Sequence, residues 1–206
     1  MEVDTVDHKK TFRAAWEDSA NTTYELPPLD VNQVLADRYE LASPLVFTRT
    51  MLWDMEVRKS RHPDIYIPYV VSGAAQSWGE GDIFVRSSTQ RLWLQPETYG
   101  LVLEQTHLDH ANQIVTFIGA AEVPGPDGEL LHAGTGQPIF HVEHGVSGTE
   151  ERPLNTWRIV SLTETPDPRF VEVFDRIAAN PDLPGFLEIY IRDVLKIELT
   201  PRREVE

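Results

Sequence analysis

The fold of this protein is decided by the stretch DIFVRSSTQRLWLQPETYGLVLEQTHLDHANQIVTFIGAAEV, residues 82–123. Short runs rich in Val, Ile, Thr, Phe and Leu alternate here with Pro, Gly, Asn and Asp, a pattern typical of strands joined by turns. The connections Gln95-Pro96-Glu97 and His110-Ala111-Asn112 are short enough for hairpins. Neighbouring strands should therefore be antiparallel.

The same pattern extends in both directions and predicts six strands between Tyr69 and Thr163. No helical crossover separates them, which excludes a parallel sheet. We expect an α+β fold built on a curved antiparallel sheet of six to seven strands. The six predicted strands are Tyr69–Trp78, Asp82–Leu94, Thr98–Asp109, Gln113–Val123, Pro138–Val146 and Thr156–Thr163.

Helical spacing of apolar residues appears on both sides of the strands. Thr48 or Thr50 can cap a helix that continues to Lys59. On this helix Lys59 shares the apolar register of Met55, and Glu56 is expected to face water. After the strands, two helical stretches are predicted, with a proline-containing break between them. These stretches are Pro168–Ala179 and Pro184–Lys196.

The N-terminal part of the chain shows weaker patterns. Residues 1–30 are acidic, contain few large apolar groups and include the stop Pro27-Pro28, so they are predicted to be a loosely attached leader with one short helix around Thr11–Ala20. Residues 31–206 are predicted to be a single domain. The segment Val31–Leu41 fits either a helix or the start of a strand.

Composition excludes several classes of function. With 33 acidic and 18 basic side chains the formal charge is −15, which repels phosphate backbones and argues against a nucleic-acid partner. There is no cysteine, so disulfides and thiolate chemistry are excluded. We find no apolar run suited to membrane insertion and no secretory signal, and expect a cytoplasmic location. No phosphate loop, nucleophile elbow or dinucleotide motif is present, so no cofactor is implied.

The order of helices and strands resembles the helix-grip fold of the START and polyketide-cyclase (SRPBCC) superfamily. The stretches Thr48-Arg49-Thr50-Met51-Leu52-Trp53 and His62-Pro63-Asp64-Ile65-Tyr66-Ile67-Pro68 resemble the helix-and-entrance segment of its AtaL-like branch. The resemblance implies an elongated cavity between sheet and final helix, which binds a polyketide-like or lipid-like molecule and cyclises, dehydrates or simply carries it. A homodimer is compatible with the sequence.

Two other folds remain open. Pro96-Glu97-Thr98-Tyr99-Gly100 and the segment Asp127–Gly134 resemble strand pairs of the hot-dog acyl thioesterases. Asn155-Thr156-Trp157-Arg158-Ile159-Val160 resembles the closing strand of the SnoaL-like cone. A further alternative is an interaction module without an internal cavity.

Three residues are predicted to carry chemistry. Alternation along a strand places His144 on an apolar face, where it could act as acid or base near neutral pH; the alternative is a hydrogen-bonded core histidine. Arg86 could polarise a carbonyl or hold a carboxylate, unless it is exposed on an edge strand. Tyr190 could move a proton. The predicted ligand-binding residues are Trp93, His107, Phe117, Phe140, Val142, Trp157 and Phe186.

Two histidine-containing motifs invite a metal interpretation. They are His107-Leu108-Asp109-His110 and His141-Val142-Glu143-His144. Within one strand, however, the two histidines of each motif point to opposite faces. We therefore predict no metal site.

Overall fold

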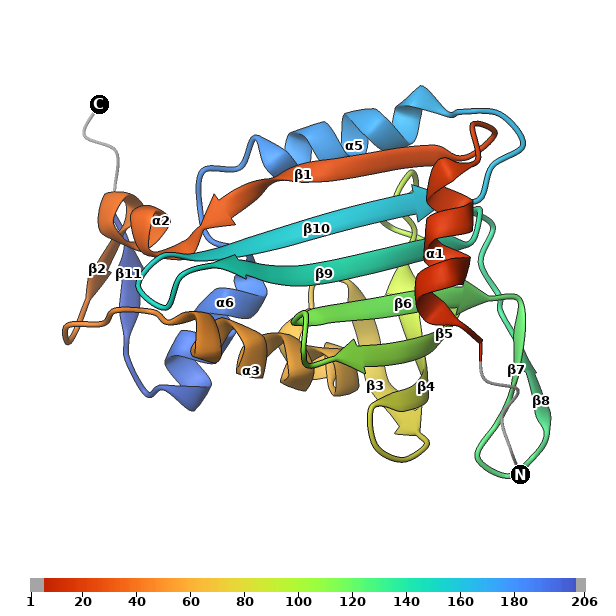
Figure 1. The fold of residues 1–206 in the computed structure, drawn as a ribbon, viewed down its shortest axis with the longest axis horizontal. Helices are drawn as coiled ribbons and strands as arrows, with labels where there is room; N and C mark the ends of the chain where they lie inside the picture. The colour runs from red at the N-terminus through yellow and green to blue at the C-terminus, as the bar shows by residue number, and fades with distance from the viewer. Residues whose placement is uncertain (1–5, 203–206) are drawn as a thin grey trace.

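A seven-stranded antiparallel sheet forms the centre of the computed structural model, which describes residues 6–202 (Figure 1). Strands β3 to β6 follow one another in the sheet, and the N-terminal strand lies beside the last long strand. All six strands predicted between Tyr69 and Thr163 are confirmed. In spatial order the sheet consists of β1 (Thr22–Asp30), β10 (Pro153–Ser161), β9 (Phe140–Gly148), β6 (Ile114–Ala120), β5 (Tyr99–Asp109), β4 (Ile83–Arg91) and β3 (Val71–Trp78).

The seventh strand, β1, comes from the segment predicted to be a loose leader. It pairs with β10 from Thr22, opposite Ser161, to Leu26, opposite Trp157, and the register then shifts before Leu29. Pro27-Pro28 lies in this shift. Proline cannot donate a ladder hydrogen bond and is confined to edge strands and bulges, and β1 is both an edge strand and irregular at this point. For the described residues 6–30, the prediction of loose attachment is therefore wrong; residues 1–5 of that predicted segment lie outside the described residues.

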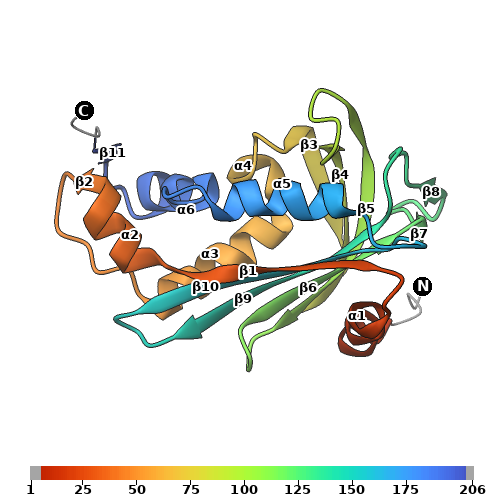
Figure 2. The same ribbon diagram turned by 90° about the horizontal axis from the view of Figure 1, so that it is seen from above.

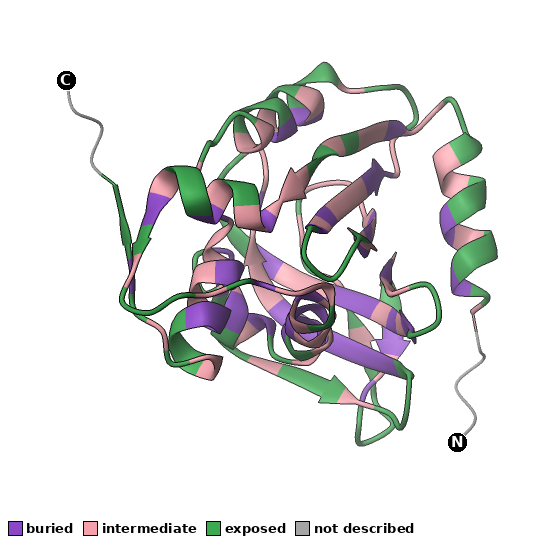
Figure 3. Cartoon of the chain, turned by 60° about the vertical axis from the view of Figure 1, so that its left-hand side comes forward, coloured by how far each residue is buried: buried purple, intermediate pink, exposed green. Residues whose placement is uncertain are grey.

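Helix α1 (His8–Glu17) packs on the outer face of the sheet, against β6, β9 and β10. The predicted helix at Thr11–Ala20 thus exists but begins and ends three residues earlier. Phe12 is only 2% exposed and packs on Ile118 and Val160. Figure 3 shows buried and exposed positions side by side along this helix, which is the pattern of a helix with one face against a sheet.

Helices α3 to α6 cover the opposite, concave face of the sheet (Figure 2). Thr48 caps α3 by accepting a hydrogen bond from the backbone N–H of Met51 at 3.1 Å, as predicted. The predicted break between the C-terminal helices is also confirmed. These elements are α3 (Arg49–Arg61), α4 (Pro63–Tyr66), α5 (Pro168–Ala178) and α6 (Gly185–Ile189), which continues as a π-helical turn (Tyr190–Val194).

The ambiguous segment Val31–Leu41 contains both of its alternatives, because helix α2 (Val31–Arg38) leads directly into strand β2 (Tyr39–Leu41). Strand β2 pairs with β11 (Leu199–Pro201), and β7 (Glu122–Pro124) pairs with β8 (Leu130–His132). Within residues 6–202, no helix is both long and apolar enough to cross a membrane.

The architecture is the helix-grip fold. In Figure 2, β3 and β4 rise out of the layer formed by β1, β10 and β9, so the sheet is strongly curved. Helix α5 packs into the curve through Phe170 and Phe174, which contact Ile159 of β10. The C-terminal segment therefore has a structural role that neither the hot-dog nor the SnoaL-like alternative provides, and both alternatives are wrong.

Candidate functional site

A cavity of about 550 Å³ lies between the concave face of the sheet and helices α3, α5 and α6. This volume falls in the range of about 300–1,000 Å³ that is typical of small-molecule sites. Aromatic and aliphatic side chains make up much of its wall. Those from the sheet include Phe117, Val142 and Trp157, Trp93 comes from the connection between β4 and β5, and those from the helices include Val173, Ile177 and Phe186.

A second hollow, of about 720 Å³, opens beside α2 and β2. It is larger, but it is a shallow depression whose lining includes the exposed side chains of Glu40, Val46 and Arg202. Specific binding of a small molecule requires that most of its surface be enclosed. The cavity between the sheet and the helices, the more enclosed of the two, is therefore the candidate site.

One wall of the enclosed cavity carries a buried cluster of charged and polar groups. The Nζ of Lys59 lies 2.7 Å from Oε2 of Glu56 and 2.7 Å from Nδ1 of His144. The side chains of Glu56 and Lys59 are 0% and 3% exposed. Asn155 completes the cluster by donating to Oε1 of Glu56 at 2.9 Å. Helix α3 supplies the ion pair, and strands β9 and β10 supply the histidine and the amide.

A second buried ion pair lies on neighbouring strands of the same wall. Nε of Arg86 on β4 lies 2.6 Å from Oε2 of Glu104 on β5. The guanidinium also donates to the backbone oxygen of Ser60 at 3.1 Å and lies 4.0 Å from the centre of the Phe117 ring. Arg86 is 6% exposed, so the alternative of an exposed edge-strand arginine is wrong.

The environment shifts the protonation of the first cluster. Burial opposes the ionisation of Glu56, but the charge of Lys59 and the contact with His144 outweigh it and lower the carboxyl pKa to about 2. Burial and the nearby charge of Arg86 lower the pKa of Lys59, and the Glu56 carboxylate acts in the opposite direction without cancelling the decrease. Burial and the charge of Lys59 lower the pKa of His144. At neutral pH the site therefore holds a carboxylate, a neutral imidazole and a lysine that loses its proton more easily than an exposed one.

His144 has one ring nitrogen inside the cluster and one left for a ligand. An ammonium can only donate, so when Lys59 is charged, Nδ1 accepts and the ring proton sits on Nε2. Among the contacts of residues 6–202, no hydrogen bond involves His144 Nε2. The imidazole is held between the rings of Phe117 and Trp157, whose centroids lie 5.7 and 5.1 Å from its own.

Seven of the ten predicted site residues line this cavity, and whether they act on a ligand stays a prediction. Of the predicted catalytic residues, His144 and Arg86 lie on the polar wall. The other five were predicted as ligand-binding residues. They are Trp93, Phe117, Val142, Trp157 and Phe186.

The structure places the other three predicted residues elsewhere. His107 is on the outer face of the sheet, where its ring lies 5.4 Å from that of His8 in α1. Phe140 packs behind the wall, against Trp93 and Phe170. The hydroxyl of Tyr190 donates to Asp54 Oδ2 at 2.8 Å, away from the cavity. None of these three residues lines the cavity, so the structure does not group them with the other seven, and their roles stay predictions.

Sequence reasoning missed the most buried members of the site. Glu56 was expected to face water, but the curved sheet covers α3 so widely that Glu56 is fully buried. The one available signal was Lys59 in the apolar register of Met55. Among the residues that the structure describes, no group of three or more His, Cys, Asp or Glu is suited to hold a metal ion.

Comparison with known proteins finds likeness in structure but not in sequence. No family model and no curated protein matches the chain. The Zhui aromatase/cyclase from Streptomyces sp. R1128 is 13% identical, with 84% of this chain and 93% of that chain covered and a TM-score of 0.49. Ara h 8.0201 is 11% identical, with 85% and 99% covered and a TM-score of 0.48. Truncated norcoclaurine synthase from Thalictrum flavum is 10% identical, with 87% and 98% covered and a TM-score of 0.47.

Proposed function

We propose that the cavity binds an apolar, polyketide-like or lipid-like molecule that carries a carbonyl group, and that Lys59 and His144 move protons during its cyclisation or dehydration. The observation that carries this proposal is the buried hydrogen bond of 2.7 Å between Lys59 and His144, beside an otherwise largely apolar cavity. Moving these charges out of water costs several kcal/mol of free energy, and a partner left unpaired costs about 3–5 kcal/mol. A site that only carried an apolar molecule would have no use for charges buried at that cost.

The charges of the polar wall favour a neutral reacting group. The cations of Lys59 and Arg86 are each paired with an internal carboxylate, Glu56 and Glu104, and His144 is neutral. A ligand carboxylate at this wall would add an uncompensated negative charge in a low-dielectric cavity. A carbonyl or hydroxyl oxygen can accept a hydrogen bond there without that cost.

The geometry supports a short proton relay. The Lys59 ammonium donates to Nδ1 of His144 at 2.7 Å, and the proton on Nε2 then passes to the ligand oxygen. Such a donor stabilises the negative charge that develops on a carbonyl oxygen during enolisation, or protonates a hydroxyl that leaves as water. The aromatic wall holds the chain so that its reacting carbons meet, which supplies part of the rate by proximity.

Binding and turnover are tested separately. Trp93 and Trp157 line the cavity, whereas Trp16 lies on α1 at the outer face. An apolar ligand should therefore quench fluorescence in a Trp16→Phe variant, and most of that quenching should be lost when Trp93 and Trp157 are both replaced by Phe. Turnover is followed by mass spectrometry of a poly-β-ketone surrogate with wild type, His144→Ala and Lys59→Met. Unchanged product with retained quenching in both variants would remove His144 and Lys59 from the chemistry, and absence of product in wild type with retained quenching would leave only the carrier function. Absence of quenching in wild type would contradict the cavity as a ligand site.

Several finer predictions accompany this proposal. They are the relation to the AtaL-like branch, a cytoplasmic location, a homodimer, and a single domain that begins near residue 31. The place of β1 in the sheet moves the expected start of that domain to within residues 6–30. Size measurement in solution tests the dimer.

A further inference from the structure

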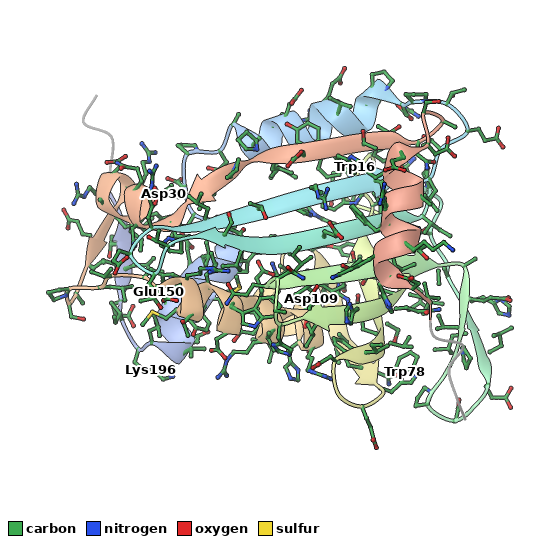
Figure 4. The ribbon with its side chains drawn as sticks, viewed as in Figure 1. Trp16, Asp30, Trp78, Asp109, Glu150 and Lys196 are labelled. Atoms are coloured by element: carbon green, nitrogen blue, oxygen red, sulfur yellow. The ribbon has the colours of Figure 1, made fainter. Side chains whose placement is uncertain are left out.

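Lys59 differs from every other lysine of the chain. The sequence contains four, Lys9, Lys10, Lys59 and Lys196. Lys59 is 3% exposed and lines the cavity, whereas the other three are exposed. Lys196 follows the π-helical turn (Figure 4), and Lys9 is paired with Asp109 on the outer face. The chain thus provides its own comparison between one buried amine and three surface amines.

The surroundings of Lys59 favour an amine that can act as a nucleophile. Its Nζ lies 3.8 Å from the centre of the Phe186 ring and 2.7 Å from Nδ1 of His144, which can take its proton. Desolvation in an apolar pocket and a neighbouring cation are the two environments that activate lysine amines towards carbonyl groups. Both occur here, because burial and Arg86 each lower the pKa of Lys59. Glu56 opposes the loss of the proton but remains as a counter-charge.

We propose that Lys59 forms an imine with an apolar aldehyde or ketone bound in the cavity. This inference rests on the proposed function, since it requires a carbonyl ligand at the same wall. Lys59 first passes one proton to Nδ1 of His144. The neutral amine then attacks the carbonyl carbon, a C–N bond forms, and one N–H proton moves to the oxygen. The imidazolium of His144 donates the second proton to that oxygen, which leaves as water when the C–O bond breaks.

The product of these steps is a protonated imine, and the site has a partner for its charge. The starting ammonium and the product iminium carry the same single positive charge, so no net charge enters or leaves the cavity. The Oε2 of Glu56 lies 2.7 Å from the Lys59 nitrogen and is paired with the cation before and after the reaction. The ion pair that holds Lys59 in place therefore also stabilises the adduct.

Reductive trapping tests the proposal. The protein is incubated at pH 7 with 2-naphthaldehyde and cyanoborohydride, which reduces the imine to a stable amine and adds the mass of the aldehyde less one oxygen atom. Peptide mapping then gives the labelling rate of each lysine. A lowered amine pKa raises the neutral fraction that attacks the carbonyl, so we expect Lys59 to be labelled faster than Lys10 or Lys196.

Two controls separate chemistry from access. In Lys59→Arg the cation and its pairing with Glu56 are kept but no imine can form, so the fast adduct should vanish while cavity fluorescence quenching remains. An excess of 2-naphthalenemethanol, which has the same ring system without the carbonyl, should slow labelling of Lys59 and leave Lys10 and Lys196 unchanged.

The outcomes distinguish this inference from the proposed function. Labelling of Lys59 no faster than of the surface lysines, with the aldehyde still quenching Trp157, would overturn the imine and leave the binding site intact. No quenching and no labelling would overturn both. The comparison among lysines is made within the wild-type protein, so it holds even if a variant fails to fold.

Discussion

Replacing Glu56 by Gln should destabilise the protein by about 3 kcal/mol at pH 7. The substitution preserves shape but leaves the Lys59 ammonium buried without its carboxylate, and breaking a buried pair in this way costs about 3–5 kcal/mol. The lowered pKa of Glu56, about 2 instead of 4.5, leads to a similar figure of about 3 kcal/mol by linkage. We place the expectation at the lower end because Lys59, whose pKa is also lowered, can release its proton.

The measurement is urea unfolding followed by tryptophan fluorescence, arranged as a double-mutant cycle. Lys59→Met should cost a similar amount, because it leaves Glu56 with only Asn155 and His144 as partners. The double variant Glu56→Gln/Lys59→Met should recover most of the loss, since replacing both members of a buried pair is often neutral or stabilising. Single variants that each lose less than about 1 kcal/mol, the scale of an exposed ion pair, would refute the conclusion that this pair is buried and coupled.

Three further predictions concern the Glu56 carboxylate, the buried histidines His8 and His141, and the packing of α1. In the wild type, the folded-state pKa of Glu56 is below its unfolded value. The contribution of Glu56 to the free energy of unfolding is therefore complete above about pH 4.5 and is lost as the pH falls towards 2. The urea midpoint should decrease over that window, and should decrease less in Glu56→Gln. Burial lowers the pKa of His8 and His141, so stability present above about pH 6.5 should be lost as pH falls below it. The protection of the α1 amides, taken relative to their intrinsic exchange rates at each pH, should decrease there, and equal protection at pH 7 and pH 5 would exclude this. Phe12→Ala should cost about 3–5 kcal/mol if α1 unfolds with the sheet; a loss below about 1 kcal/mol together with rapid proteolysis near residue 20 would show instead that α1 detaches by itself.

Most of the sheet could be predicted because its strands alternate and its turns are marked. Hairpins at Gln95-Pro96-Glu97 and His110-Ala111-Asn112 depend only on local residues, and the structure confirms both neighbouring pairs. The strand β1 could not be found in the same way. Its pairing partner lies more than 120 residues away at β10, and the prolines that interrupt it suggest the end of an element unless its edge position is known.

In the candidate site, too, some residues could be predicted from local sequence and others depend on long-range contacts. Alternation along β9 is a local property, and it predicted the apolar face of His144, which the structure shows lining the cavity; Arg86, for which a site role and an exposed position were both left open, also lines it. Glu56 and Lys59 depend on how far the sheet covers α3, which involves contacts between segments about 90 to 100 residues apart, such as Asn155 with Glu56. The helical pattern alone predicts that a carboxylate such as Glu56 faces solvent. It does not show that a cation such as Lys59 will offset the cost of burying that carboxylate.

The interruption between α5 and α6 has a consequence for how a molecule gets in. Asn180, Asp182, Leu183, Pro184 and Gly185 all line the cavity, so the joint itself forms part of the wall. A single unbroken helix would have to swing as a rod, dragging its whole apolar face off the sheet. Here Phe170 and Phe174 fix α5 on the sheet independently of the joint, so we expect a guest to enter by a local rearrangement of the joint that leaves the rest of the molecule undisturbed.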